Sequence, residues 1–166
     1  MKETILAFLD SIGIKYAFSA MEKEGFLPGL ELREGVLIID PEKLKYVGDI
    51  LHEAGHLACM PLAVRAGMTG VLPNNDMMQG GEMMAMAWSF AACKHLQLEA
   101  TVVFHKDGYK GEAATLIAAY EAGNGPGIPL LQWLGMCYDQ HTAAQNGTQP
   151  FPHMKQWLCT TNKYTA

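Results

Sequence analysis

The sequence predicts a single domain of the α+β class, with a small, mainly antiparallel sheet in its first part and helices after it. Three observations predict this class. The chain of 166 residues is long enough for one domain with a genuine core. Short runs of apolar and β-branched residues, separated by turn signals, occupy much of the first 40 positions. From about position 44 onwards, apolar residues recur at the spacing of helices.

The first 40 residues predict one helix and three short strands. Apolar residues at helical spacing predict a helix over residues 3–12, which Gly13 ends. Alternation of apolar and polar residues favours a strand at about 14–20, and Leu30-Glu31-Leu32 is typical of a short strand. Turn residues then lead into the β-branched run Val36–Ile39, which suits a buried strand. We expect these strands to form the small sheet.

The next segment predicts a long amphipathic helix. Asp40-Pro41-Glu42 carries a capping Asp, a Pro at the first helical position and an acid in the first turn. Apolar residues then recur at helical spacing from Leu44 to Ala58, until Pro61 stops the run. Gly55 costs such a helix up to about 1 kcal/mol relative to Ala. The close approach of a neighbouring backbone would explain that cost.

The remainder of the chain predicts further helices joined by loops. Residues 61–81 are rich in Gly, Pro and Asn, which indicates a long connection that could border a functional cleft. We expect an almost wholly apolar, buried helix from about Glu82 to Leu96, and another helix from Glu112 to Ala122. The other expected segments are a short strand or extended link at 98–104, a turn at 105–109, a rigid loop at 125–129, a short apolar element at 130–138, a polar, turn-rich stretch at 139–150 and a docking segment at 151–158.

The composition argues against several classes of function. A net charge of −5 and a pI near 5.6 argue against nucleic acid or an anionic membrane as the main partner. No run reaches the roughly 18 apolar residues that a membrane span needs. The first ten residues lack a secretory h-region, so we expect a cytoplasmic protein. The four Cys form no C-x-x-C pair, which favours reduced and mostly buried thiols.

The segment His52-Glu53-Ala54-Gly55-His56 predicts a chemistry. Residues four apart on an α-helix lie about 40° from each other and roughly 6 Å along the axis. His52 and His56 can therefore bind one cation from one face. Glu53, on a neighbouring face, can reach a water molecule without acting as a ligand. This is the H-E-x-x-H pattern of zinc hydrolases, in which the Glu is the general base. The alternative is a helix with two surface histidines and a solvated Glu.

A catalytic zinc usually has three protein ligands and one open position, so a third ligand is expected. The candidates are Glu82, Asp76, His95, His105, His141 and His153. Glu82 is favoured, because a carboxylate at the head of an apolar helix turns into the core only if something cationic meets it. The small residues Ala85 and Ser89 on its face allow a neighbouring helix to come near. The alternative is that Glu82 only complements the positive end of the helix dipole.

The expected strand, the Asp-Pro-capped helix with His52-Glu53-x-x-His56 and the later Glu82-x-x-Ala85 resemble the gluzincin branch of the zincin metallopeptidases. They most resemble the small ImmA/IrrE-type peptidases, over roughly residues 14–95. The resemblance implies a zincin-like fold, with a twisted sheet packed on the active-site helix and the substrate along an edge strand. It also implies a zinc metallopeptidase acting on a peptide or protein. The neighbours of Glu82 differ from the acids and the Asn that are common in that family.

The ligand set implies a mechanism of hydrolysis. Zinc held by the two imidazoles and Glu82 lowers the pKa of its water towards about 7. Glu53 takes the proton, the hydroxide attacks a carbonyl, and Glu53 can return the proton to a leaving amine. The oxyanion needs another donor. His105 or Tyr109, in the turn after the second helix, could supply it.

A rival hypothesis from a different class is a zincin-fold module that binds a metal, a small ligand or a protein without turnover. Eleven Met residues suit an adaptable binding surface, and two clusters of them flank the expected cleft. These clusters are Met77-Met78 and Met83-Met84-Met86. Glu53 favours the enzyme, because a purely structural metal site needs no uncoordinated base.

Overall fold

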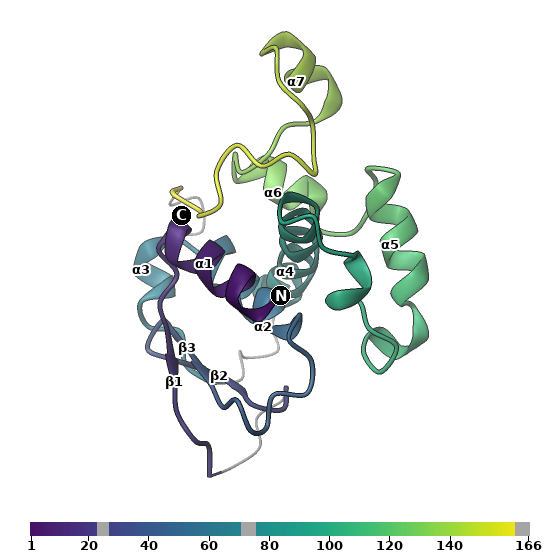
Figure 1. The fold of residues 1–166 in the computed structure, drawn as a ribbon. Helices are drawn as coiled ribbons and strands as arrows, with labels where there is room; N and C mark the ends of the chain where they lie inside the picture. Colours follow the sequence, from purple (N-terminus) through teal and green to yellow (C-terminus); the bar gives the residue numbers. More distant parts are fainter. Residues whose placement is uncertain (23–26, 71–75, 162–166) are drawn as a thin grey trace.

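The computed structural model describes residues 1–22, 27–70 and 76–161, with side chains in all of these except 76–79. Its first part holds α1 (Lys2–Ile12), β1 (Tyr16–Phe18), β2 (Leu30–Arg33) and β3 (Val36–Ile39). The later elements are helices: α2 (Asp49–Cys59), α3 (Leu62–Arg65), α4 (Asp76–His95), the 3-10 turns η1 (Ala100–Val102) and η2 (Tyr109–Gly111), α5 (Ala113–Glu121), α6 (Ile128–Trp133) and α7 (Gln140–Gln145). Figure 1 shows the strands on one side of the molecule and most of the helices on the other, and the α+β class is confirmed.

The three strands form a mixed sheet in the order β1-β3-β2. β2 and β3 pair antiparallel through a tight turn at Glu34 and Gly35, whose φ angles of 48° and 73° fit a two-residue hairpin. β1 pairs with the other side of β3 in parallel, with Tyr16 opposite Leu37. The expectation of a mainly antiparallel sheet is therefore wrong for one of the two pairings. The hairpin is encoded in a local turn, whereas the direction of β1 depends on the path of the chain between β1 and β2.

The helix predicted to start at Asp40 begins at Asp49 instead. The carboxylate of the buried Asp40 accepts hydrogen bonds from the backbone N–H groups of Met21 and Glu42, at 2.8 and 3.0 Å. The N–H of Leu44 bonds to the carbonyl of Asp40 at 3.0 Å and completes a single turn. Asp40 therefore initiates a turn, as its residue type indicates, but it also anchors the distant Met21. A regular helix does not continue from that turn.

Gly48 marks the true entry to α2. A Cβ atom on this residue would lie 1.9 Å from the carbonyl oxygen of Val102 and 2.4 Å from its carbonyl carbon. Only a glycine lets the chain pass so close to the segment that holds η1. The helix then runs from Asp49 to Cys59, and nearly all of its residues are buried.

The boundaries of the second long helix also differ from the prediction. α4 begins at Asp76, six residues before Glu82, so the connection after α2 is shorter than expected and contains α3. The strand or link expected at 98–104 is the 3-10 turn η1, which packs against α4 and α5 rather than beside the sheet. A run rich in β-branched residues forms a strand only where a partner strand lies beside it.

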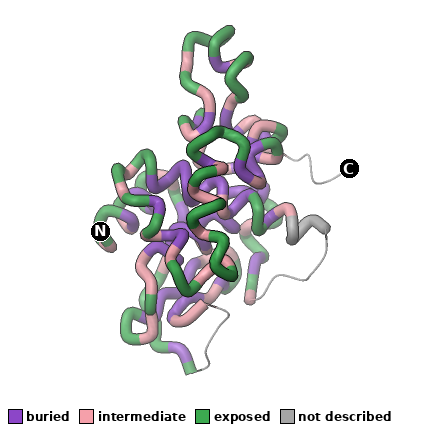
Figure 2. The backbone as a smooth tube through the Cα atoms, turned by 90° about the vertical axis from the view of Figure 1, so that its right-hand side faces the viewer, coloured by how far each residue is buried: buried purple, intermediate pink, exposed green. Residues whose placement is uncertain are grey.

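The last third of the chain follows the prediction more closely. α5 occupies nearly all of the predicted range, and the apolar element of undetermined type is α6. The turn-rich stretch contains α7, whose N-cap Asp139 accepts a hydrogen bond from the N–H of Thr142 at 2.9 Å. The final segment docks as expected, because the indole Nε1 of Trp88 donates to the carbonyl of Trp157 at 2.9 Å. In Figure 2 the buried residues gather in the middle of the molecule, whereas the end that carries α7 is largely exposed.

The core is built around α2 and α4. α2 packs chiefly on α4 and also contacts β2 and α1. Trp88 and Phe90 of α4 are fully buried, as are Ile50 and Leu51 of α2. In the part of the chain that the structure describes, no helix combines the length and hydrophobicity that spanning a bilayer requires.

Candidate metal centre

The H-E-x-x-H segment lies in a helix that is fixed at both ends. Gly48 holds the N-terminal end close to the η1 segment, as described above. At the other end, Nε of Arg65 donates to the carbonyl of Leu57 at 2.7 Å, and its Nη2 donates to the carbonyls of Met60 and Cys159 at 2.9 and 3.2 Å. The last carbonyls of a helix have no partner within the helix. Arg65 therefore supplies donors at the C-terminal end of α2.

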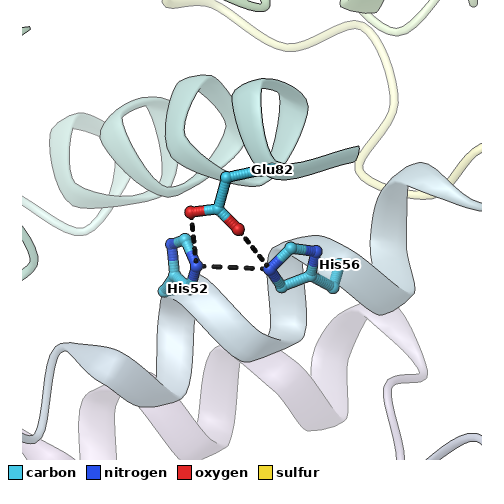
Figure 3. A group of neighbouring side chains, drawn as sticks. All are labelled: His52, His56 and Glu82. Carbon is cyan, nitrogen blue, oxygen red and sulfur yellow. Dashed lines mark hydrogen bonds and ion pairs between the residues drawn. The ribbon is translucent and has the colours of Figure 1, made fainter. Parts of the chain in front are cut away.

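His52 and His56 of α2 and Glu82 of α4 converge on one point (Figure 3). The Nε2 atoms of the two imidazoles are 3.2 Å apart. Nε2 of His52 lies 3.3 Å from Oε1 of Glu82, and Nε2 of His56 lies 3.2 Å from Oε2. Each imidazole side chain is 8% exposed, whereas the Glu82 side chain is 51% exposed. The cluster is therefore closed on the side of the imidazoles and open towards solvent at the carboxylate.

The donor set and its spacing fit a zinc ion. A tetrahedral zinc with bonds of about 2.0 to 2.1 Å holds its ligand atoms roughly 3.3 Å apart. The separations between the two imidazole nitrogens, and between each nitrogen and one of the two oxygens of Glu82, are 3.2 to 3.3 Å and close to that value. Two imidazoles and one carboxylate are also a known ligand set for catalytic zinc, with a fourth position left open. The residues present therefore fit the ion that the sequence predicts.

Close packing of α2 on α4 brings these ligands together. A Cβ atom on Gly55 would lie 3.0 Å from both the Cα and the carbonyl oxygen of Ala85. The hydroxyl of Ser89 donates to the carbonyl of Leu51 at 3.3 Å and to that of Ala85 at 2.6 Å. The glycine and the small residues of α4 therefore let the backbones approach, as their residue types predict. The distance between the helices sets the distance between Glu82 and the histidines.

The position of Glu82 in its helix argues against the helix-dipole alternative. Because α4 begins at Asp76, Glu82 is not in the first turn of the helix, where an acid complements the dipole most strongly. Its carboxylate instead points at the two imidazoles. The prediction that Glu82 meets the histidines is confirmed, although the expected reason, a place at the head of the helix, is wrong.

The charges of the cluster favour a cation at its centre. Burial raises the pKa of Glu82, but hydrogen bonds from His52 and His56, and then their charges, outweigh burial and hold that pKa well below its usual range. Burial lowers the pKa of His52. The hydrogen bond and charge of Glu82, followed by the charges of Glu53 and Asp49, act in the opposite direction, and the net shift is upward. The raised pKa of His52 and the lowered pKa of Glu82 both indicate that a positive charge beside the carboxylate is favoured.

Glu53 differs from the ligands in its surroundings. It lies one residue after His52, about 100° further round the helix. Its side chain is partly exposed, and no hydrogen bond or ion pair engages its carboxylate among the described residues. Its charge nevertheless contributes to the raised pKa of His52. Glu53 is thus near the cluster without being part of it, as a general base requires.

Of the predicted oxyanion donors, Tyr109 contacts the ring of His52, and His105 contacts Asp49, about one turn earlier in α2. Tyr109 Oη is 3.4 Å from Nδ1 of His52, the ring nitrogen that faces away from Glu82. Nε2 of His105 is 3.0 Å from Oδ1 of the buried Asp49. Both residues therefore contact α2 rather than the open side at Glu82. Their role as oxyanion donors stays a prediction that these contacts do not support.

Sequence reasoning did not find Asp49. Burial raises the pKa of this carboxyl, while the hydrogen bond and charge of His105, and then the charge of His52, oppose the increase. The His105 ring also stacks on Tyr46, with centroids 3.6 Å apart and an interplanar angle of 14°. A signal for Asp49 was present, since it precedes His52 by three residues and so shares its helix face.

None of the other candidate ligands with a described side chain joins the cluster of His52, His56 and Glu82. His95 is at the far end of α4 and packs against Phe8 and Trp157. His141 is exposed on α7 and contacts Gln145, and His153 is exposed after that helix. Asp76 begins α4, where side chains fall outside the described residues. Within the described side chains, His52, His56 and Glu82 make the one group of three or more possible ligands close enough for one ion.

Comparison with known proteins gives no family for this chain. No protein-family model matches it, and searches of the curated proteins and of the solved structures likewise find no match. The case for a function therefore rests on the geometry of the site.

Proposed function

We propose that the protein is a zinc-dependent hydrolase that cleaves peptide or amide bonds, with His52, His56 and Glu82 as ligands and Glu53 as general base. One observation carries the proposal: the two imidazole nitrogens and the carboxylate of Glu82 come from two separate helices and lie 3.2 to 3.3 Å from one another, close enough to bind one ion. An isolated pair of histidines on a helix needs no carboxylate aimed at it from a neighbouring helix.

The chemistry is divided between the ion and this chain. Zinc bound here would supply Lewis acidity, which polarises a carbonyl oxygen and lowers the pKa of a water molecule to about 7. His52 and His56 hold their Nε2 lone pairs at a buried point, where the low exposure of the rings limits competing water. Glu53, which is partly exposed, removes the proton of the attacking water and can deliver it to the leaving amine.

The exposure of the cluster supports approach of the substrate from the side of Glu82, because the imidazoles cover the other side. We further propose a zincin-like arrangement of sheet and active-site helix, supported by the contacts of α2 with β2. A peptide or protein in the cytoplasm is the proposed substrate. The four cysteines are buried and none of them is in a disulfide, which suits a reducing compartment.

Replacing Glu53 with Gln tests the catalytic part of the proposal. The substitution keeps the size of the side chain but removes its ability to accept a proton. We expect the Glu53→Gln variant to bind zinc like wild type and to lose a factor of ~10²–10⁴ in hydrolytic rate. Zinc content and the rate of cleavage of a broad peptide mixture are measured on the same preparations.

Glu3→Gln is the matched control, because the Glu3 side chain is 84% exposed in the first turn of α1. It should change neither zinc content nor rate. If wild type and Glu53→Gln bind zinc and are equally inert on the mixture, the enzyme proposal fails. The rival module that binds without turnover would then lead, and the partly exposed Met83 beside Glu82 would be a place to look for its ligand.

A further inference from the structure

Tyr109 contacts His52 at the ring nitrogen that faces away from Glu82. The hydroxyl of Tyr109 lies 3.4 Å from Nδ1 of His52, and the two rings meet edge to face at 78°, with centroids 6.3 Å apart. A metal at Nε2 requires the tautomer that carries its proton on Nδ1. That proton then needs an acceptor, and the oxygen of Tyr109 is placed to be it.

The loop that carries Tyr109 is strained. Tyr109 and Lys110 have φ angles of 57° and 51°, in the left-handed region that residues with a side chain seldom adopt. Two such residues in succession persist only where the surroundings hold them, and such strain concentrates at functional sites. The strained pair directs the Tyr109 side chain inward while the Lys110 side chain remains exposed.

His105 and Asp49 anchor the start of this loop on α2. Nε2 of His105 is 3.0 Å from Oδ1 of Asp49, and the N–H of Gly108 donates to the carbonyl of His105 at 3.1 Å. A Cβ on Gly108 would lie 3.1 Å from Cε1 of His105, so the turn folds tightly over the imidazole. The loop is thus tied to the same helix whose histidine it contacts. Asp49 and His52 stand one turn apart on that helix.

Packing holds the phenol in place. Its ring lies against that of Phe104, with centroids 5.0 Å apart. A phenol oxygen has lone pairs that can accept a hydrogen bond from an N–H donor.

We propose that Tyr109 is a positioning residue: it accepts the Nδ1–H of His52 and so holds the Nε2 lone pair of that imidazole towards His56 and Glu82. The inference rests on the proposed metal site and assigns Tyr109 a role behind that site rather than among the reacting atoms. The two imidazoles are unequal in this respect. Nδ1 of His56 is buried and has no hydrogen-bond partner among the described residues, so no hydrogen bond at that nitrogen fixes the orientation of the ring.

The test compares Tyr109→Phe with Tyr120→Phe. Tyr120 is a buried phenol that, like the partly buried Tyr109, packs on Phe104, but its hydroxyl donates to the carbonyl of Pro126 at 3.0 Å. Zinc affinity is measured by competition with a chromophoric chelator, and the ligand geometry by the visible spectrum of the Co²⁺-loaded protein. Loss of a partner behind a metal-binding histidine typically weakens binding by about 10- to 100-fold. We expect that loss, with an altered Co²⁺ spectrum, in Tyr109→Phe and in neither wild type nor Tyr120→Phe.

A second measurement reads the contact directly. In zinc-loaded protein with ¹⁵N-labelled histidine, the Nδ1 proton of His52 should exchange with water faster in Tyr109→Phe than in wild type. The Nδ1 proton of His56 serves as the internal reference and should not change. This readout separates a lost hydrogen bond from a general loosening of the core, which would speed exchange at both histidines.

Each outcome decides the question. Wild-type affinity and unchanged exchange in Tyr109→Phe would overturn the inference and leave the proposed function standing. Equal weakening in both Tyr→Phe variants would also overturn it, because the effect would then be that of any lost buried hydroxyl. A wild-type protein that binds no zinc would defeat the proposed function, and the inference would fail with it.

Discussion

At the scale of single residues, one buried carboxylate can override a strong local signal. Asp40 has the sequence context of a helix cap, but it serves as a junction between the segment at Met21 and the turn after β3. The N–H of Met21 contributes most to lowering the pKa of Asp40. Burial opposes this effect, whereas the N–H groups of Glu42 and Lys43 and the charge of Lys43 add to it. The net direction is downward, so the folded protein prefers the ionised form.

This preference predicts a pH-dependent contribution to stability. An unfolded Asp has a pKa of about 3.9. Because the pKa of folded Asp40 is lower, its stabilising effect is fully present above about pH 3.9 and is lost as the pH falls through the folded value. Asp40→Asn should therefore have a lower Tm than wild type near neutral pH. The difference in Tm between the two proteins should become smaller in acid. Thermal unfolding of both proteins from pH 6 to pH 2 measures this difference; a difference of constant size would contradict the assignment.

The proposed ligands show what residue types can and cannot predict. His52 and His56 follow from the i, i+4 spacing alone, and Glu82 follows from the need of a carboxylate in an apolar helix for a positive partner. The position of Tyr109 does not follow from spacing. It depends on a strained loop that is anchored on α2 through His105 and Asp49. The sequence placed Tyr109 and His105 near the site, but it could not show on which side of the imidazoles they lie.

At the scale of the elements, the approach of α2 to α4 sets the site. Gly55 is a position of close approach between the two helices, and its nearest neighbours are backbone atoms rather than the end of a flexible side chain. An alanine there would gain up to about 1 kcal/mol in helix propensity. Its Cβ would also lie 3.0 Å from the Cα and carbonyl oxygen of Ala85, so one helix would have to move.

We therefore expect Gly55→Ala to destabilise the protein by about 1 kcal/mol or more, because overpacking typically costs about 1–3 kcal/mol and exceeds the gain in propensity. The zinc affinity should fall as well, since Glu82 would be displaced from the histidines. Gly80→Ala is the matched control. Its Cβ would lie 3.6 Å from Cδ1 of Leu130, which is ordinary contact, so it should stabilise by up to about 1 kcal/mol. Urea denaturation and zinc competition of both variants measure these effects; equal stability in the two variants would count against the packing argument.

Elements defined by their own periodicity were predictable, and elements defined by distant partners were not. The strands β2 and β3, α1 and α5 carry their signals within their own residues and the adjoining turns. The start of α2 depends on the contact of Gly48 with Val102, and the direction of β1 depends on the return path of the chain. The run at 98–104 has strand propensity but packs on α4 and α5, where it forms a 3-10 turn.

At the scale of the whole molecule, a metal at this site would connect helices that lie far apart in the sequence. α2 and α4 are otherwise joined by packing and by the hydroxyl of Ser89. A ligand that binds only the folded protein stabilises it by about 2.7 kcal/mol at a free concentration of 100 times Kd. The zinc-loaded protein should thus resist heat better than the metal-free one.

For a domain of this size, that stabilisation corresponds to a rise in Tm of about 5–10 °C. Differential scanning calorimetry in buffered zinc and in EDTA measures the rise. His52→Ala should show none of it, because the variant lacks a ligand. A rise of the same size in His52→Ala would place the metal elsewhere on the protein.

The unequal exposure of the three ligands has a kinetic consequence. Water reaches Glu82 but hardly reaches the imidazoles, so the carboxylate is the ligand whose bond to an ion is most easily exchanged. Release of a bound ion would then begin at α4, and a small chelator would occupy the freed coordination position before either imidazole dissociated. The helix that bears the histidines would not need to unfold for the ion to leave. An ion in this site would therefore combine tight binding at equilibrium with rapid transfer to a competing chelator.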